Sequence, residues 1–310
     1  MKTSELRMRD PYIIEPTPGQ FVLFGTTDEN LWGGPGTGFD CYTSSDLENW
    51  EGPIEAFRPP VGFWGDTQFW APEVHEYRGR FYMFATFASS TGSPKFRGVA
   101  SLVSDSVTGP FLPWSEGALT PADIPCLDGT LFVDEDSVPW LVFSHGAEGI
   151  PGGAPGNADS SMYAMRLSED LKAPAGEVHT LFKASSAPWS KPLWFPPGVE
   201  PPEQLNLAKD PMFTDGPYFV SAPGGALLMM WSSFGEEGYA IGVAVSESGS
   251  VLGPWVQNPE PLWARNGGHG MILRTSDARD LLVFHWPNDT PNERVKITPV
   301  VIEADGIRLA

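Results

Sequence analysis

Short apolar runs recur along the chain at a nearly regular interval. Each is four or five residues long, a length typical of buried strands rather than helices. The runs are Phe21–Phe24, Phe81–Phe84, Trp140–Phe143, Leu227–Trp231 and Leu281–Phe284. Successive runs start 60, 59, 87 and 54 residues apart. The pattern predicts five similar β-units whose inner strands carry these runs, with an insertion at Ser185–Asp210 in the one long interval.

A second feature follows each of the first four runs. It is a turn in which a serine stands beside an acidic residue, at Ser45-Asp46, Ser104-Asp105, Ser168-Glu169 and Ser246-Glu247, and it predicts an outer strand after each turn. A period near sixty residues with several short strands per unit is typical of a radial array. We therefore predict an all-β fold, a single five-bladed β-propeller spanning residues 1–310. A β-sandwich, or a pair of them, is the alternative, but it does not require the same strand order to recur.

Composition narrows the class of protein. The 34 glycines, 32 prolines and 12% aromatic residues fit short strands and turns. A formal net charge of −20, from 39 acidic and 19 basic residues, argues against a nucleic-acid partner, because phosphate binding needs clustered Lys and Arg. No apolar run is long enough to span a membrane, so no membrane partner is expected.

Cysteine content and the N-terminal segment suggest the compartment. Cys41 and Cys126 are too few for a disulfide framework and are expected to be free thiols. Residues 1–10 are charged and lack an apolar signal core, which predicts a cytoplasmic location. Oligomeric state is not indicated by the sequence.

Three aspartates far apart in the chain each stand beside a turn-forming residue. They are Asp10 before Pro11, Asp128 before Gly129, and Asp215 before Gly216. In a propeller the inner strands converge on a central channel, so residues at their ends face one another. The fold would thus gather these carboxyls in one acidic pocket, and paired carboxyls are what cleavage of a glycosidic bond needs.

Five motifs, taken in order, resemble glycoside hydrolase family 43. They are Arg9-Asp10-Pro11-Tyr12-Ile13, Phe69-Trp70-Ala71-Pro72-Glu73-Val74, Leu127-Asp128-Gly129, Thr214-Asp215-Gly216-Pro217 and Gly267-Gly268-His269-Gly270. The resemblance implies a five-bladed propeller and an inverting hydrolase of pentose-containing plant glycans. It also implies Asp10 as general base, Asp128 as the residue that orients the acid and tunes its pKa, and Asp215 as general acid.

The acid position departs from the family pattern. The family has glutamate before Gly-Pro, whereas this chain has Asp215, which is one methylene shorter. Glu73 in the second motif is the alternative proton donor. The expected activity is that of an α-L-arabinofuranosidase or β-xylosidase on arabinose- or xylose-containing oligosaccharides. An endo-arabinanase, or a propeller that binds carbohydrate without turnover, is the alternative.

Aromatic residues near the motifs are candidates for sugar contact, because flat apolar rings stack on the C–H faces of sugars. We expect Trp64, Trp70 and Trp32 either to contact substrate or to pack inside the blades. The insertion Ser185–Asp210, with Trp189 and Trp194, either borders the pocket or is a solvated connection.

Glycines flank His269 and leave its imidazole accessible. The resemblance places His269 in the channel near substrate, where it would contact a calcium or other ion through water. No cofactor is required for the reaction. His145 and His285 follow apolar runs and are expected either at the pocket border or as satisfied residues at strand ends.

Overall fold

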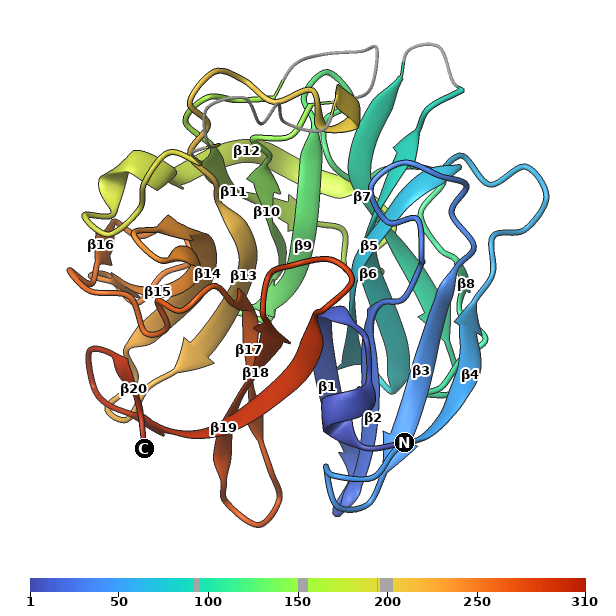
Figure 1. The fold of residues 1–310 in the computed structure, drawn as a ribbon, viewed down its shortest axis with the longest axis horizontal. Helices are drawn as coiled ribbons and strands as arrows, with labels where there is room; N and C mark the ends of the chain where they lie inside the picture. Colours follow the sequence, from blue (N-terminus) through green and yellow to red (C-terminus); the bar gives the residue numbers. More distant parts are fainter. Residues whose placement is uncertain (92–94, 150–155, 194, 196–202) are drawn as a thin grey trace.

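The computed structural model describes residues 1–91, 95–149, 156–193, 195 and 203–310. Within them, twenty strands form five antiparallel sheets of four strands each (Figure 1). The helical segments are short 3₁₀ turns, η1 (Thr3–Glu5), η2 (Ala184–Ser186) and η3 (Glu203–Leu205). Among the described residues, no helix is both long and apolar enough to cross a bilayer.

Each sheet contains four strands that are consecutive in the chain. Blade I contains β1 (Arg9–Thr17), β2 (Gln20–Thr26), β3 (Phe39–Ser44) and β4 (Glu51–Phe57). Blade II contains β5 (Thr67–Tyr77), β6 (Arg80–Ser89), β7 (Phe96–Ser104) and β8 (Leu112–Pro113). Blade III contains β9 (Cys126–Val133), β10 (Pro139–His145), β11 (Ser161–Leu167) and β12 (Pro174–Lys183). Blade IV contains β13 (Asp215–Ser221), β14 (Leu227–Gly235), β15 (Gly238–Ser246) and β16 (Trp255–Gln257). Blade V contains β17 (Gly268–Arg274), β18 (Asp280–Trp286), β19 (Arg294–Ile302) and β20 (Ile307–Leu309).

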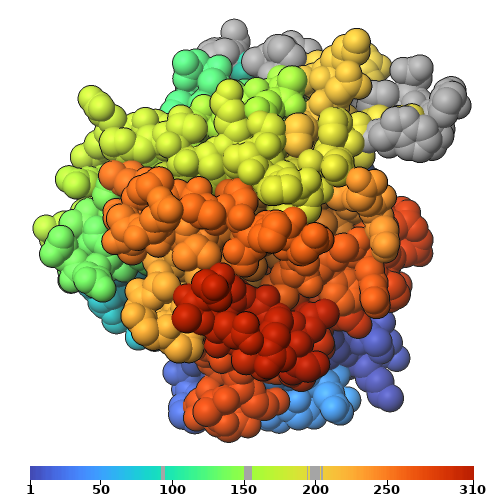
Figure 2. Space-filling view, turned by 90° about the vertical axis from the view of Figure 1, so that its left-hand side faces the viewer, coloured from blue at the N-terminus to red at the C-terminus, as the bar shows by residue number. Residues whose placement is uncertain are grey.

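This arrangement confirms the predicted five-bladed propeller. The ring closes through isolated bridges of the N-terminal segment, from Arg7 to Arg294 in blade V and from Lys2 to Asn49 in blade I. Figure 2 shows the outer side of the molecule, where segments of blade III (yellow-green), blade IV (orange) and blade V (red) lie in successive bands. The Ser-acid turns precede the outer strands β4, β8, β12 and β16, as the sequence indicates.

The apolar runs lie one strand further out than predicted. They form the second strands, β2, β6, β10, β14 and β18, rather than the inner ones. A second strand packs against the neighbouring blade on each of its faces, so both sets of side chains are buried and the strand reads as a continuous apolar run. The inner strands border the channel and therefore carry the polar motifs.

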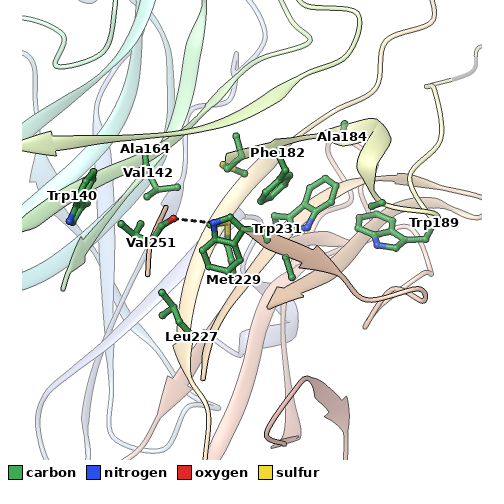
Figure 3. Close-up of a cluster of buried hydrophobic side chains, with 14 of the residues drawn as sticks. Trp140, Val142, Ala164, Phe182, Ala184, Trp189, Leu227, Met229, Trp231 and Val251 are labelled. Carbon is green, nitrogen blue, oxygen red and sulfur yellow. Dashed lines mark hydrogen bonds between the residues drawn. The ribbon is translucent and has the colours of Figure 1, made fainter. Parts of the chain in front are cut away.

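The interface between blades III and IV is an aromatic core (Figure 3). Trp231 of β14 is fully buried there, and its Nε1 donates to Oε1 of Gln257 at 2.9 Å. Trp189 packs on Trp231 with ring centroids 4.9 Å apart. The prediction that Trp189 borders the pocket was wrong. Its indole is buried between two blades, because removing this apolar surface from water is favourable. Trp194 lies outside the described residues.

Replacing Trp231 should destabilise the protein more than it affects the site. Trp231→Ala removes a buried indole and leaves a cavity between two blades, which should lower the free energy of unfolding by about 3–5 kcal/mol. Urea unfolding followed by circular dichroism measures this loss. Val256→Ala, at a half-exposed position on β16, is the control and should unfold near the wild-type midpoint. Equal midpoints for both variants would contradict the packing described here.

Candidate active site

A repeated backbone irregularity aims side chains into the channel. Each inner strand has a register shift near its start, and a residue with positive φ lies there. These residues are Asp10 (52°), Ala71 (47°), Asp128 (55°), Gly216 (48°) and His269 (53°), and β5, which has two shifts, also contains Gln68 (52°). Bulges of this kind redirect a side chain and are frequent beside active sites. The propeller therefore presents such a residue from every blade at the same end of the channel.

The second strand of the preceding blade anchors the bulges of blades I, II, III and V. The backbone N–H of Ala71 donates to Thr26 at 2.9 Å, that of Asp128 to Thr86 at 2.9 Å, and that of His269 to Ser232 at 2.8 Å. In blade I the acceptor is not a hydroxyl: the N–H of Asp10 donates to Nδ1 of His285 at 3.2 Å. Neighbouring blades thus fix the backbone at these catalytic candidates.

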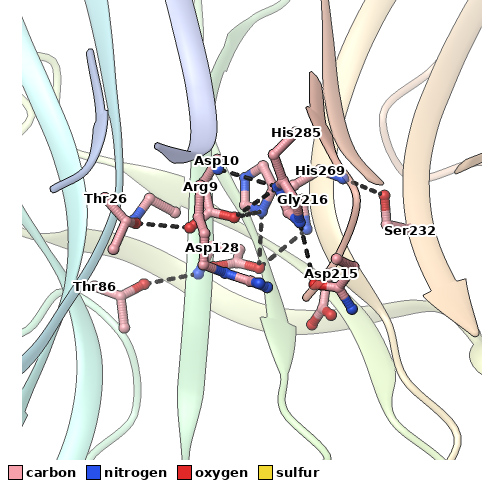
Figure 4. Close-up of polar contacts among 12 residues, drawn as sticks. Arg9, Asp10, Thr26, Thr86, Asp128, Asp215, Gly216, Ser232, His269 and His285 are labelled. Carbon is pink, nitrogen blue, oxygen red and sulfur yellow. Dashed lines mark hydrogen bonds and ion pairs between the residues drawn. The ribbon is translucent and has the colours of Figure 1, made fainter. Parts of the chain in front are cut away.

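The three predicted aspartates line one small pocket (Figure 4). Its wall is completed by a set of polar and aromatic residues: Arg9, Thr26, Trp32, Trp70, Glu148, Tyr239 and His269. A larger groove runs past the far part of β1 near Glu15 and Arg274, and none of the three aspartates lines it. The chemistry is therefore concentrated in the smaller pocket.

Asp10 is held as an anion. Thr26 donates to its Oδ2 at 2.6 Å, and Nδ1 of His269 lies 3.3 Å from its Oδ1. Burial pushes the pKa of Asp10 upward, but the imidazole of His269 and the guanidinium of Arg9 outweigh this and hold it below its usual value. An ionised carboxylate can accept a proton, which is what a general base must do.

His285 supports Asp10 as a neutral ring. The side chain is fully buried, and burial together with the charge of Arg9 lowers its pKa to about 3. Nδ1 accepts the N–H of Asp10, so the ring proton is on Nε2, which faces Oδ1 of Asn288 at 3.2 Å. His285 is not part of the pocket lining; it is a hydrogen-bonded residue near the end of β18, one of the two locations expected from the sequence. His145 stacks on Tyr163 and is not part of the pocket lining either.

Asp128 lies between the other two aspartates in chain order and contacts the fourth and fifth motifs. The N–H of Gly216 donates to its Oδ2 at 3.1 Å, and Nδ1 of His269 lies 3.6 Å from the same oxygen. Burial and then the charge of Asp10 raise the pKa of Asp128 to about 6, against the opposing effect of His269. Gly216 is needed here, because a Cβ would lie 2.9 Å from the His269 ring.

Asp215 is held as an acid. It is buried, and its Oδ2 accepts a hydrogen bond from the Tyr239 hydroxyl at 3.0 Å while Oδ1 has no partner. Burial, followed by the charges of Glu148 and Asp128, raises the pKa of Asp215 well above its usual value. A carboxyl that keeps its proton near neutral pH can donate it, as a general acid must.

The aromatic candidates divide between the pocket and the core. Trp32 and Trp70 line the pocket, with centroids 5.9 Å apart in an edge-to-face arrangement. Nε1 of Trp70 donates to the Leu31 carbonyl at 2.6 Å, and the Arg9 guanidinium lies 5.0 Å from the Trp32 ring centroid. Trp64 instead stacks on Phe96 at 4.9 Å, away from the pocket lining. Contact of Trp32 and Trp70 with sugar stays a prediction.

Glu73, the alternative proton donor, points elsewhere. Its Oε2 lies 3.1 Å from Nε2 of His75, and it is not among the pocket-lining residues. We expect Glu73→Gln to lose far less activity than the roughly 10²–10⁴-fold that removal of a proton-transfer group costs. Steady-state rates on the same substrate as the wild type test this. A loss in that range, with the fold retained, would return Glu73 to the list of proton donors.

His269 faces carboxylates rather than a free ligand position. Its Nδ1 is directed at Asp10 and Asp128, as Figure 4 shows. Within the part of the chain that the structure describes, no group of three or more His, Cys, Asp and Glu side chains is arranged to hold a metal ion. The water-mediated ion at His269 stays a prediction.

Several pocket residues were not predicted from the sequence. Arg9 and Tyr239 flank the aspartates, and Arg9 could have been found because it precedes Asp10 in the first motif. Tyr239 is the second residue of β15, and nothing in its local sequence marks it. Glu148 lies in the glycine-rich loop after β10, and nothing in its local sequence marks it either. Cys41 and Cys126 are buried free thiols, as expected.

Comparison with known proteins identifies the family. The family model for glycosyl hydrolases family 43 matches residues 3–308. The crystal structure of an endo-arabinase from Bacteroides thetaiotaomicron VPI-5482 is 38% identical, covers 98% of each chain and superimposes with a TM-score of 0.83.

Two curated relatives are more distant. Extracellular endo-α-(1→5)-L-arabinanase 1 of Bacillus subtilis (strain 168) is 27% identical over 187 residues, covering 56% of this chain and 50% of that protein. α-L-Arabinofuranosidase 43 of Humicola insolens is 22% identical over 338 residues, covering 97% of this chain and 61% of that protein. This chain thus spans between half and two thirds of the length of these relatives. With the family model matched along nearly its whole length and its carboxyls gathered in one pocket, the chain belongs to glycoside hydrolase family 43, a family of inverting enzymes.

Proposed function

We propose that this chain is an endo-acting arabinanase that hydrolyses α-1,5-linked arabinan with inversion at the anomeric carbon. One observation carries the catalytic part of the proposal. Two carboxyls in a single pocket, Asp10 and Asp215, have pKa values displaced in opposite directions, below and above the usual value. Such a separation assigns the base and the acid of a glycosidase.

The proposed reaction is a single displacement. Asp10 takes a proton from a water molecule as the water oxygen bonds to the anomeric carbon. The bond from that carbon to the leaving sugar breaks, its electron pair goes to the leaving oxygen, and this oxygen takes the proton of Asp215. Asp128 raises the cost of ionising Asp215, so the acid stays protonated until the bond breaks. No cofactor takes part.

The relatives support the substrate class. The structure at 38% identity is named an endo-arabinase, and the Bacillus subtilis relative is named for the α-(1→5)-L-arabinan linkage. These names favour the endo-arabinanase alternative over the arabinofuranosidase or xylosidase activity expected from the sequence. Trp32 and Trp70 offer fixed aromatic rings at the pocket wall, which suits the apolar face of a furanose.

Digestion of linear α-1,5-arabinan tests the proposal. An endo enzyme should release a ladder of arabino-oligosaccharides and lower viscosity early, whereas an exo enzyme releases arabinose or one short product from the start. Chromatography of the products over time, with viscometry, separates the two. Arabinose alone, or release only from aryl xylosides, would overturn the endo-arabinanase assignment. Binding of arabinan without any release would indicate a carbohydrate-binding propeller instead.

A further inference from the structure

Glu148 enters the catalytic pocket from outside the five inner strands. It lies in the loop after β10 of blade III, and its side chain is part of the pocket wall together with Asp215 and Asp128. Only 8% of the residue is exposed, and its Oε2 has no hydrogen-bond partner. Asp215 has an unpartnered oxygen as well, Oδ1. A buried carboxyl oxygen without a partner is costly and calls for a ligand or a proton.

The loop that carries Glu148 is fixed by a second blade. Arg97 of β7 in blade II donates from Nη1 to the Glu148 carbonyl at 3.2 Å, and from Nη2 to the Gly149 carbonyl. The N–H of Gly149 donates to the Leu205 carbonyl at 2.8 Å. The guanidinium therefore holds the backbone of Glu148, and the side chain is left to face the pocket.

Buried charge around the pocket is unbalanced. Arg9 is paired with Glu293 at 3.0 Å and lies beside Asp10. Arg97 uses its N–H groups on Gln68 and on carbonyls, so its charge is balanced only through space, by Glu148 and Asp128 first. Asp128, Glu148 and Asp215 are thus three buried carboxyls near Arg97, and the other cationic neighbours, Arg9 and His269, also face Asp10. The three carboxyls cannot all be ionised at once, because an uncompensated buried charge is strongly unfavourable.

We propose that Glu148 is a positioning carboxyl of the acid site, whose charge at the pocket wall keeps the proton on Asp215 until the leaving oxygen takes it. This inference rests on the proposed hydrolase function. It bears on the shortened acid of this chain: Asp215 has less reach than the family's glutamate, and a second carboxyl in the same wall makes loss of its proton to solvent less favourable.

Electrostatics agree with this role. Burial raises the pKa of Glu148 even against the charge of Arg97. After burial, the charge of Glu148 contributes most to the raised pKa of Asp215. The titratable and charged groups around the pair come from six elements and one loop: Arg9 and Asp10 on β1, Arg97 on β7, Asp128 on β9, Asp215 on β13, Tyr239 on β15, His269 on β17 and Glu148 in the loop after β10. Removing the charge of Glu148 leaves the other groups in place.

The test is the pH profile of kcat/KM on arabinan for the wild type, Glu148→Gln and Glu148→Asp. Glu148→Gln keeps the shape of the side chain and removes its charge. The alkaline limb of the profile, where Asp215 loses its proton, should therefore shift to lower pH by about one unit. Glu148→Asp retains a carboxyl and should restore most of the wild-type limb. Glu73→Gln removes a buried glutamate outside the pocket and should leave the limb where it is.

A second readout does not depend on turnover. The ¹³C NMR signal of the Asp215 carboxyl, assigned with Asp215→Asn, should titrate at lower pH in Glu148→Gln than in the wild type. Coincident titrations and coincident alkaline limbs would overturn the role of Glu148, whatever happens to the rate. A wild type that turns over no arabinan while the NMR shift is present would count against the proposed function and not against the coupling.

Discussion

Asp10→Asn is expected to lose turnover of arabinan by about 10³–10⁴-fold while the protein stays folded. The amide has the same shape but cannot take a proton from water, so the displacement loses its base. Thr26 and His285 contact this residue from neighbouring strands and should still find an amide oxygen and an unchanged backbone. Initial rates on linear arabinan, with circular dichroism and a thermal melt, measure both parts of the expectation.

Asp105→Asn is the matched control for this variant. Asp105 carries an exposed surface ion pair with Arg80, and exposed pairs contribute little to stability. It should keep wild-type activity. The profile of the wild type adds a pH check: because the pKa of Asp10 is held below its usual value, activity should persist as pH falls until that carboxylate is protonated. Wild-type turnover by Asp10→Asn would remove Asp10 from the base role.

Asp215→Asn is expected to lose activity in a way that depends on the leaving group. On arabinan the leaving sugar oxygen needs a proton, and the loss should be about 10²–10⁴-fold. In a nitrophenyl arabinofuranoside the leaving group is nitrophenolate, a stabilised anion that needs no proton, so its hydrolysis should lose much less. The ratio of the two losses is the measurement. Because Asp215 is buried and its proton is retained by burial and by the charges of Glu148 and Asp128, it is prepared to donate that proton to the leaving oxygen.

Tyr239→Phe serves as the control for the acid. It removes the hydroxyl that donates to Oδ2 of Asp215 and leaves the carboxyl in place. The loss of that hydrogen bond, which favours the ionised form, should make Asp215 harder to ionise without abolishing donation. Equal losses on arabinan and on the nitrophenyl substrate for Asp215→Asn would contradict its role as proton donor.

The fold and the three aspartates could be read from the sequence for a physical reason. In every blade of a propeller the second strand must be buried against the neighbouring blades, so the apolar runs and the turns recur with a measurable period. Asp10, Asp128 and Asp215 each belong to a short motif at an inner-strand bulge, and proximity to Pro or Gly marks that position. The inner strands themselves were misplaced, because full burial on both faces gives the second strands, such as β14, the strongest apolar signal.

The rest of the site depends on contacts between blades, which local sequence does not encode. Glu148 stands in a glycine-rich loop and reaches the pocket only because Arg97 of another blade holds its backbone. His285 has the sequence context of any residue after an apolar run. Trp64 and Trp189 are tryptophans, the residue type that often stacks on sugars, yet here they pack against neighbouring aromatic rings. In each case tertiary packing decided which polar or aromatic group faces the channel.

The anomeric configuration of the first product tests the central claim most directly. Proton NMR of the wild type acting on linear α-1,5-arabinan follows the new reducing end before mutarotation. Inversion by water activated at Asp10 predicts that the β-anomer appears first and the α-anomer only later. First appearance of the α-anomer would mean a retaining mechanism and would contradict the assignment of Asp10 and Asp215 as base and acid.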